Sequence, residues 1–176
     1  MKGITFLTIA FSILLFSCSP SRDKMLGKIS KMEKEMKTAQ KVDTNAVTNL
    51  LSAYQNFASK YPDDSLAPEN LYKAAGLAVG FNRGTQAIDL YESIMNNYPK
   101  YKKVPECFFM EGYAYENVIG NIAKASEYYN KFLAKYPNHE LADDASAAIK
   151  YLGKSPEEMV HEFEKMNADT TKTAEK

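Results

Sequence analysis

AIDLYESIMNNYP, at residues 87–99, is written a second time as ASEYYNKFLAKYP at residues 125–137, with alanine, tyrosine and the final Tyr-Pro pair at the same spacing. A weaker copy, LLSAYQNFASKYP, occupies residues 50–62. Each copy predicts a helix that ends at its proline, because proline has no backbone N–H for a further helical turn. The closing prolines are 37 and then 38 residues apart. A period of this size predicts a stack of repeated helical units.

The composition indicates a folded protein with no overall charge bias. Of the 176 residues, 45% are hydrophobic and 25% are charged, which is typical of a globular body. Basic and acidic side chains number 22 each, so no net field attracts nucleic acid. We therefore expect no nucleic-acid partner, and we expect a core that is spread along the stack.

The first residues have the features of an export signal. Lys2 supplies a positive charge, and residues 4–16 form an almost unbroken apolar run. At about 1.5 Å per helical residue, this run is too short to cross a hydrocarbon core of roughly 30 Å. We expect residues 1–17 to be a cleaved signal peptide.

Leu15-x-Ser17-Cys18 resembles the lipobox of bacterial lipoproteins. The resemblance implies cleavage before Cys18, covalent lipid on Cys18 and, with Ser19 following, sorting to the outer membrane. Several acyl chains make a lasting anchor. We expect residues 18–23 to be a lipidated tether and the chain to face the periplasm. The alternative is an ordinary signal peptide cut nearby, which would leave Cys18 as a free thiol.

An all-α solenoid of about seven to eight helices is expected over residues 24–166, followed by a disordered polar tail at 167–176. The first helix, 24–39, has one apolar stripe surrounded by lysines. Its basic face is either the solvated outer side of the stack or a contact with anionic lipid. The next two helices are expected at 45–60 and 68–80. One helix then carries Ala87 and ends at Pro99, another begins at Pro105 and carries Tyr115, and a third carries Ala125 and ends at Pro137. The last two are expected from Leu141 to Leu152 and, as a C-terminal cap, from Ser155 to Met166.

The paired helices resemble tetratricopeptide (TPR) repeats. With Pro68 as the first position of a unit, the large, small, small, aromatic and proline places hold Leu71, Ala75, Ala87, Tyr91 and Pro99. With Pro105 as the first position of the next unit, Phe108, Gly112 and Tyr115 are in register, whereas Ala125, Tyr129 and Pro137 come one residue late. We place the extra residue in the turn near Gly120. Glu111 stands where the motif usually has leucine.

The Tyr-Pro helix ends and the upstream lipobox also resemble the periplasmic TPR lipoproteins of the BamD type, over about residues 45–153. This resemblance implies a membrane-anchored scaffold or adaptor in a bacterial envelope complex, for example in outer-membrane protein assembly. The alternative is a lipoprotein that binds a ligand or cell-wall fragments. In both cases the partner lies in the cell envelope.

Catalytic and metal-binding patterns are not evident. The two histidines, His139 and His161, do not supply the three or four ligands of a zinc site. We read no phosphate loop and no nucleophile motif. We therefore predict a non-enzymatic protein with no metal and no cofactor beyond the lipid on Cys18, and we expect Cys107 to be a core residue.

Aromatic residues on the first helix of each unit are the candidate binding site. Tyr72, Phe109 and Tyr113 fall where TPR units face their groove, and Glu69, Glu106 and Glu116 lie near them in the sequence. Aromatic anchors beside carboxylates suit a bound peptide or helix. We predict that these six residues form a partner-binding groove.

Overall fold

The computed structural model describes residues 21–41, 43–162 and 164–165, and its regular elements are all helical within these ranges. They are α1 (Arg22–Thr38), α2 (Thr44–Lys60), α3 (Ala67–Gly80), α4 (Gly84–Asn97), α5 (Val104–Ala114), the π-helical η1 (Tyr115–Ile119), α6 (Ile122–Lys135) and α7 (Ala142–Tyr151). Residues 156–162 are helical too. The predicted signal peptide at 1–17, Cys18 and the predicted tail at 167–176 lie outside the described residues.

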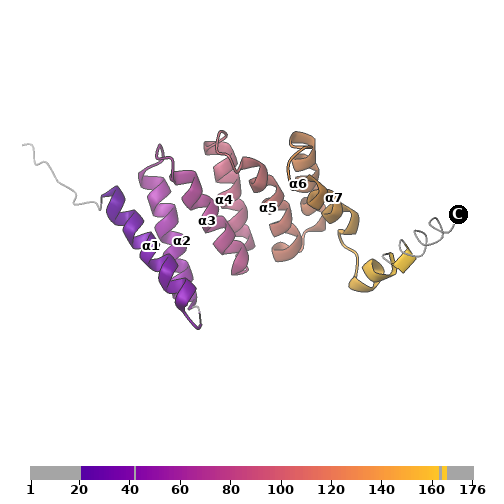
Figure 1. Ribbon diagram of the computed structural model, residues 1–176, viewed down its shortest axis with the longest axis horizontal. Helices are drawn as coiled ribbons and strands as arrows, with labels where there is room; N and C mark the ends of the chain where they lie inside the picture. The colour runs from indigo at the N-terminus through magenta and orange to yellow at the C-terminus, as the bar shows by residue number, and fades with distance from the viewer. Residues whose placement is uncertain (1–20, 42, 163, 166–176) are drawn as a thin grey trace, which may run out of the picture.

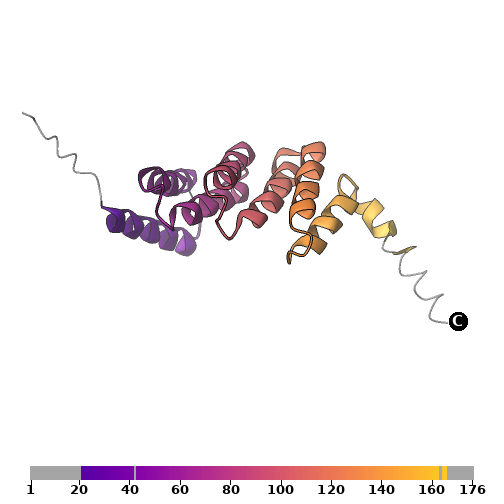
Figure 2. The same ribbon diagram turned by 90° about the horizontal axis from the view of Figure 1, so that it is seen from above.

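The helices form a solenoid in which each packs on the next along the chain, as Figure 1 shows. The odd-numbered helices α1, α3, α5 and α7 make one layer and α2, α4 and α6 make the other (Figure 2). The predicted fold class is therefore confirmed. No helix among the described residues is long and apolar enough to span a bilayer.

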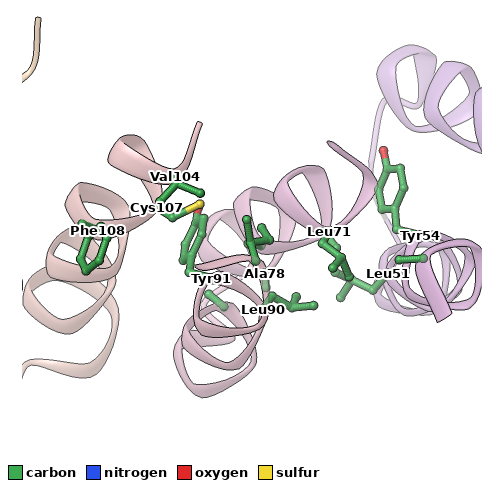
Figure 3. Close-up of a cluster of buried hydrophobic side chains, with 14 of the residues drawn as sticks. Leu51, Tyr54, Leu71, Ala78, Leu90, Tyr91, Val104, Cys107 and Phe108 are labelled. Carbon is green, nitrogen blue, oxygen red and sulfur yellow. The ribbon is translucent and has the colours of Figure 1, made fainter. Parts of the chain in front are cut away.

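The core follows the repeated stretch. Tyr54, Tyr91 and Tyr129 occupy equivalent places on α2, α4 and α6, and all three are buried. One turn later on each helix, Phe57, Ile94 and Phe132 are completely buried. All six belong to one continuous hydrophobic cluster with side chains of α3 and α5. Figure 3 shows part of it, with Tyr54 and Tyr91 beside Leu71 of α3 and Cys107 of α5. Burying each such side chain contributes about 1.5–3 kcal/mol, so the repeat is mainly a packing pattern.

The loops after the closing prolines are copies of one turn. In each loop, the third residue after the tyrosine of the Tyr-Pro pair donates its backbone N–H to the carbonyl of that tyrosine. The donors are Asp64, Tyr101 and His139. The carbonyls of those three residues then accept from the first residues of α3, α5 and α7. The loops are therefore structurally equivalent although their side chains differ, which sets the same entry point for each new unit.

The extra residue of the second unit lies in η1. In the first unit, a backbone bond from Arg83 N–H to the Ala78 carbonyl closes the helix, with Asn82 at φ 58°. In the second unit, the equivalent bond runs from Asn121 N–H to the Tyr115 carbonyl, with Gly120 at φ 76°. The second bond spans one more residue, because the last turn is a π-turn instead of an α-turn. The insertion expected in the turn near Gly120 is thus located in the helical turn before it.

A capping box opens the terminal helix, as predicted. The Glu158 N–H donates to Ser155 Oγ at 3.2 Å, and Glu158 Oε2 accepts from the Ser155 N–H at 2.7 Å. In α7, Ser146 and Lys150 stand where α3 has Leu71 and Ala75. A polar face at these two places ends the stack, because it offers a further helix no apolar contact.

Candidate functional site

The six predicted groove residues lie on α3, α5 and η1. Four of them contact tyrosines: Glu69 and Tyr72 contact Tyr101, whereas Phe109 and Glu116 contact Tyr129. Tyr72 is half-buried, with its ring 6.0 Å from that of Tyr91 and 6.4 Å from that of Tyr101. The ammonium group of Lys103 lies 4.5 Å from the centre of the Tyr72 ring. Burial raises the pKa of Tyr72 to about 12. Tyr72 therefore takes part in the packing between neighbouring units.

Glu69 belongs to the same cluster. Its carboxylate accepts from the Tyr101 hydroxyl at 2.6 Å and from Lys103 Nζ at 3.2 Å. Desolvation pushes the pKa of Glu69 upward, but these two hydrogen bonds outweigh it, so the pKa lies below its ordinary value. Glu69 is thus ionised and engaged within the protein, where it links α3 to the loop before α5.

Glu106 occupies the equivalent place on α5, with a weaker partner. Its Oε2 is buried without a hydrogen bond, and His139 Nε2 lies 3.9 Å away. His139 is the counterpart of Tyr101 in the next loop. The contact between a helix glutamate and the following loop therefore recurs at the same place in both units. The loop partner is Tyr101 for Glu69 and His139 for Glu106.

Phe109 and Glu116 meet at Tyr129. The Phe109 ring lies 5.5 Å from the Tyr129 ring, and Glu116 Oε2 accepts from the Tyr129 hydroxyl at 2.8 Å. Tyr113, by contrast, is 40% exposed on α5. Among the three predicted aromatic anchors, Tyr113 thus has the most accessible side chain, and its role in binding stays a prediction.

A groove that the sequence interpretation missed lies at the other end of the stack. It runs between α1 and α3, has a volume of about 430 Å³ and has α2 as its floor. Met36, Leu50 and Leu77 supply its apolar surface, and the polar lining residues are Glu33, Lys37, Tyr54 and Lys73. We call it the α1–α3 groove. An apolar surface with a few fixed polar groups is the usual character of a binding site.

The polar groups of this groove are held in place by one carboxylate. Glu33 Oε1 accepts from the Tyr54 hydroxyl at 2.7 Å and from Lys73 Nζ at 2.9 Å. Desolvation acts to raise the pKa of Glu33, yet the hydrogen bonds from Tyr54 and Lys73 lower it below the ordinary value. Burial, followed by the hydrogen bond to Glu33, raises the pKa of Tyr54. The network therefore presents an ionised, fixed carboxylate beside apolar carbon.

Sequence spacing gave no signal for this network, because its members are 21 and 40 residues apart along the chain. Met36 falls on the apolar stripe of the first helix, whereas no motif or spacing marks Glu33 and Lys73 as partners. These hydrogen bonds form because α1 and α3 both pack on α2, which brings Glu33 and Lys73 within bonding distance of each other. Within the described residues, no group of three or more histidine, cysteine or carboxylate side chains could hold a metal ion.

Comparison with known families supports the repeat at the centre of the stack. The family model of the tetratricopeptide repeat matches residues 106–139. Residues 106–139 form a tetratricopeptide repeat. The TPR match begins in α5, includes the π-turn and ends in the loop after α6. No curated protein sequence matches the chain. TPR units are typically non-enzymatic protein-interaction modules, which agrees with a scaffold.

Proposed function

We propose that this protein is a membrane-anchored scaffold that docks a partner protein in a bacterial envelope complex, for example one that assembles outer-membrane proteins. The TPR match supports protein binding as the general activity. The α1–α3 groove carries the proposal, because it combines apolar surface with polar groups already fixed by Glu33. A partner that enters it meets side chains whose conformations are set in advance.

The exposed ring of Tyr113 on α5 extends the proposed binding surface along the odd-numbered helices. A helix or extended segment that lies across α1, α3 and α5 would place apolar side chains over Met36 and Leu77 at one end and against Tyr113 at the other. This arrangement uses the surface that stacked helical pairs present to their partners.

The lipobox at Leu15–Cys18 supports the membrane anchor. In this proposal Cys18 carries the lipid, residues 19–21 connect it to α1, and the folded stack lies on the periplasmic face of the outer membrane. Labelled palmitate should enter the wild-type protein and be absent from Cys18→Ala. Equal labelling of both proteins would remove the anchor from the proposal and leave the groove unaffected.

The groove is tested with the double variant Met36→Ala, Leu77→Ala, which removes apolar surface without adding charge. Envelope cross-linking and pull-down should recover at least about tenfold less partner with this variant than with the wild type. The control is Val160→Ala, since Val160 is 55% exposed and lies far along the chain from the groove. Undiminished recovery by the double variant would contradict the groove. Recovery of cell-wall fragments in place of a stoichiometric protein would favour the alternative of a cell-wall-binding lipoprotein.

A further inference from the structure

A polar hollow of about 420 Å³ lies between the C-terminal halves of α2 and α4. These two helices belong to the layer of even-numbered helices in Figure 2. The buried side chains of Ala58 on α2 and Leu71 on α3 form its floor. The other lining residues are Gln55, Ser59, Pro62, Asp63, Ser93, Asn97 and Tyr98. We call it the α2–α4 hollow.

Four lining positions of this hollow carry smaller side chains than their counterparts one unit later. The pairs are Ala58 and Met95, Leu71 and Phe108, Ser93 and Lys131, and Asn97 and Lys135. In the second unit, the ammonium group of Lys135 lies 4.4 Å from the centre of the Phe108 ring, so a long side chain extends over the equivalent floor. The short side chains of the first unit leave this space open.

A second hollow continues the first one around Tyr98. Its volume is about 600 Å³, and it shares Pro62, Asp63, Asn97 and Tyr98 with the α2–α4 hollow. From there it extends along the loop to Tyr101. Both volumes fall in the range typical of ligand sites. The two hollows therefore form one trough that has room for an extended ligand.

The hydrogen-bonding groups of the α2–α4 hollow are mostly uncharged. Asn97 Nδ2 donates to Ser93 Oγ at 3.1 Å, which leaves Asn97 Oδ1 as an acceptor. Among the described residues, neither the Gln55 amide nor the Ser59 hydroxyl has a protein partner. An amide side chain both donates and accepts hydrogen bonds, and a hydroxyl does so too. An apolar ligand would leave these groups without partners, which costs binding free energy.

The charges along the trough do not select a charged ligand. Its charged lining residues are Asp63, Asp64, Lys100 and Lys102, which are two of each sign. Asp64 is already paired with Arg22. In the α2–α4 hollow itself, Asp63 is the one charged lining residue, and it is exposed to water. The ligand that this lining suits best is therefore polar and uncharged.

We propose that the trough binds an uncharged glycan. In the α2–α4 hollow, hydroxyl groups of one sugar ring exchange hydrogen bonds with Gln55, Ser59 and Asn97, and its C–H face packs on Tyr98, which is half-buried and shared by both hollows. Sugar hydroxyls both donate and accept, as the amides do. A peptide gains most of its affinity from aromatic, large apolar or charged anchors, for which this hollow offers only a small floor. The site is separate from the α1–α3 groove and does not depend on the proposed docking of a partner protein.

Isothermal titration calorimetry on the chain from Cys18 onward, which contains all described helices, tests the proposal with maltotriose and tri-N-acetylchitotriose. The filling variant Ser93→Lys, Asn97→Lys introduces the residues found in the second unit. Its matched control, Asn56→Lys, Asn96→Lys, adds the same charge at exposed places outside the hollow. The hydrogen-bond variant is Gln55→Ala, Asn97→Ala, with Asn96→Ala, Asn130→Ala as its control. Thermal unfolding verifies that each variant folds.

At least one of the two oligosaccharides should bind the wild type. The filling variant should weaken this binding at least about tenfold because lysine side chains occupy the space. The hydrogen-bond variant should weaken it at least about fivefold, and both controls should change it less than about twofold. The proposal is overturned if neither oligosaccharide binds or if the filling variant binds as tightly as its control. A peptide of serine and asparagine that binds more tightly than both oligosaccharides, and is lost in the same variants, would assign the trough to peptides and also overturn it.

Discussion

The hydroxyl of Tyr54 on α2 donates a 2.7 Å hydrogen bond to Glu33 Oε1 on α1, so the tyrosine of the first repeated stretch is tied to the helix that precedes it. Tyr129 makes the same kind of bond to Glu116 two units later. A residue type that is repeated for packing thus also fixes a carboxylate on the facing helix, and in the first unit that carboxylate lines the α1–α3 groove.

Tyr54→Phe should destabilise the fold by about 1–2 kcal/mol, because it removes a hydrogen bond to a charged group while keeping the ring. Urea unfolding measures the change. Tyr113→Phe is the matched control, since that side chain is exposed, and it should change stability by less than about 0.5 kcal/mol. Equal effects of the two substitutions would show that the bond to Glu33 contributes nothing.

The acid side of the stability profile should depend on Glu33. Its pKa is lowered in the folded protein, so its contribution is present above its unfolded pKa and is lost as the pH falls through the folded pKa. Glu33→Gln should therefore flatten the fall in stability below about pH 4.5. Urea midpoints measured across this range provide the test, and unchanged profiles would contradict it.

Glu111 should make the protein less stable as the pH rises from 4.5 to about 8. It is completely buried on α5, both its oxygens lack a hydrogen-bond partner, and desolvation raises its pKa to about 8. The nearby Tyr128 hydroxyl, which also donates to Glu92 at 3.4 Å, lowers the pKa of Glu111 but does not outweigh the desolvation. Between these pH values the unfolded chain has lost the proton and the folded chain has kept it, so stability falls by up to about 1.4 kcal/mol per pH unit.

Glu111→Leu, which restores the usual residue of the motif, should remove this pH dependence and raise stability most at pH 8. Urea unfolding between pH 5 and 9 measures it. Glu127→Leu is a control on the neighbouring helix, where the carboxylate is exposed and paired with Lys124 and Lys131. A pH profile that is the same for wild type and Glu111→Leu would show that Glu111 does not titrate in this range.

Gly112→Ala should destabilise by about 1–3 kcal/mol, because an added Cβ would lie 2.8 Å from the Tyr129 ring. That ring is held by Glu116 and Phe109. Gly76→Ala, on the open face of α3 with no atom near the added Cβ, should instead stabilise by about 0.5–1 kcal/mol. Thermal unfolding of the two variants gives the comparison, and shifts of the same sign would refute the steric explanation.

Gly120→Ala should cost about 1 kcal/mol, because Gly120 closes the π-turn at φ 76°, where a side chain is strained. No neighbouring atom would meet its Cβ, so the cost would come from the backbone alone. Gly27→Ala, within α1 and equally open, is the control and should stabilise. Thermal unfolding measures both, and a neutral Gly120→Ala would mean that the turn relaxes.

The sequence by itself determined the solenoid, its helix order and its core. Tyr91, Ile94 and Pro99, together with their copies, define local helix faces and ends, and local periodicity is enough to place them. The 38-residue interval likewise revealed an extra residue, although only backbone hydrogen bonding showed that η1 absorbs it as a π-turn. Tertiary structure decided the candidate sites. Glu33 meets Tyr54 and Lys73 because stacking sets which distant residues face one another, and no spacing along the chain encodes those distances.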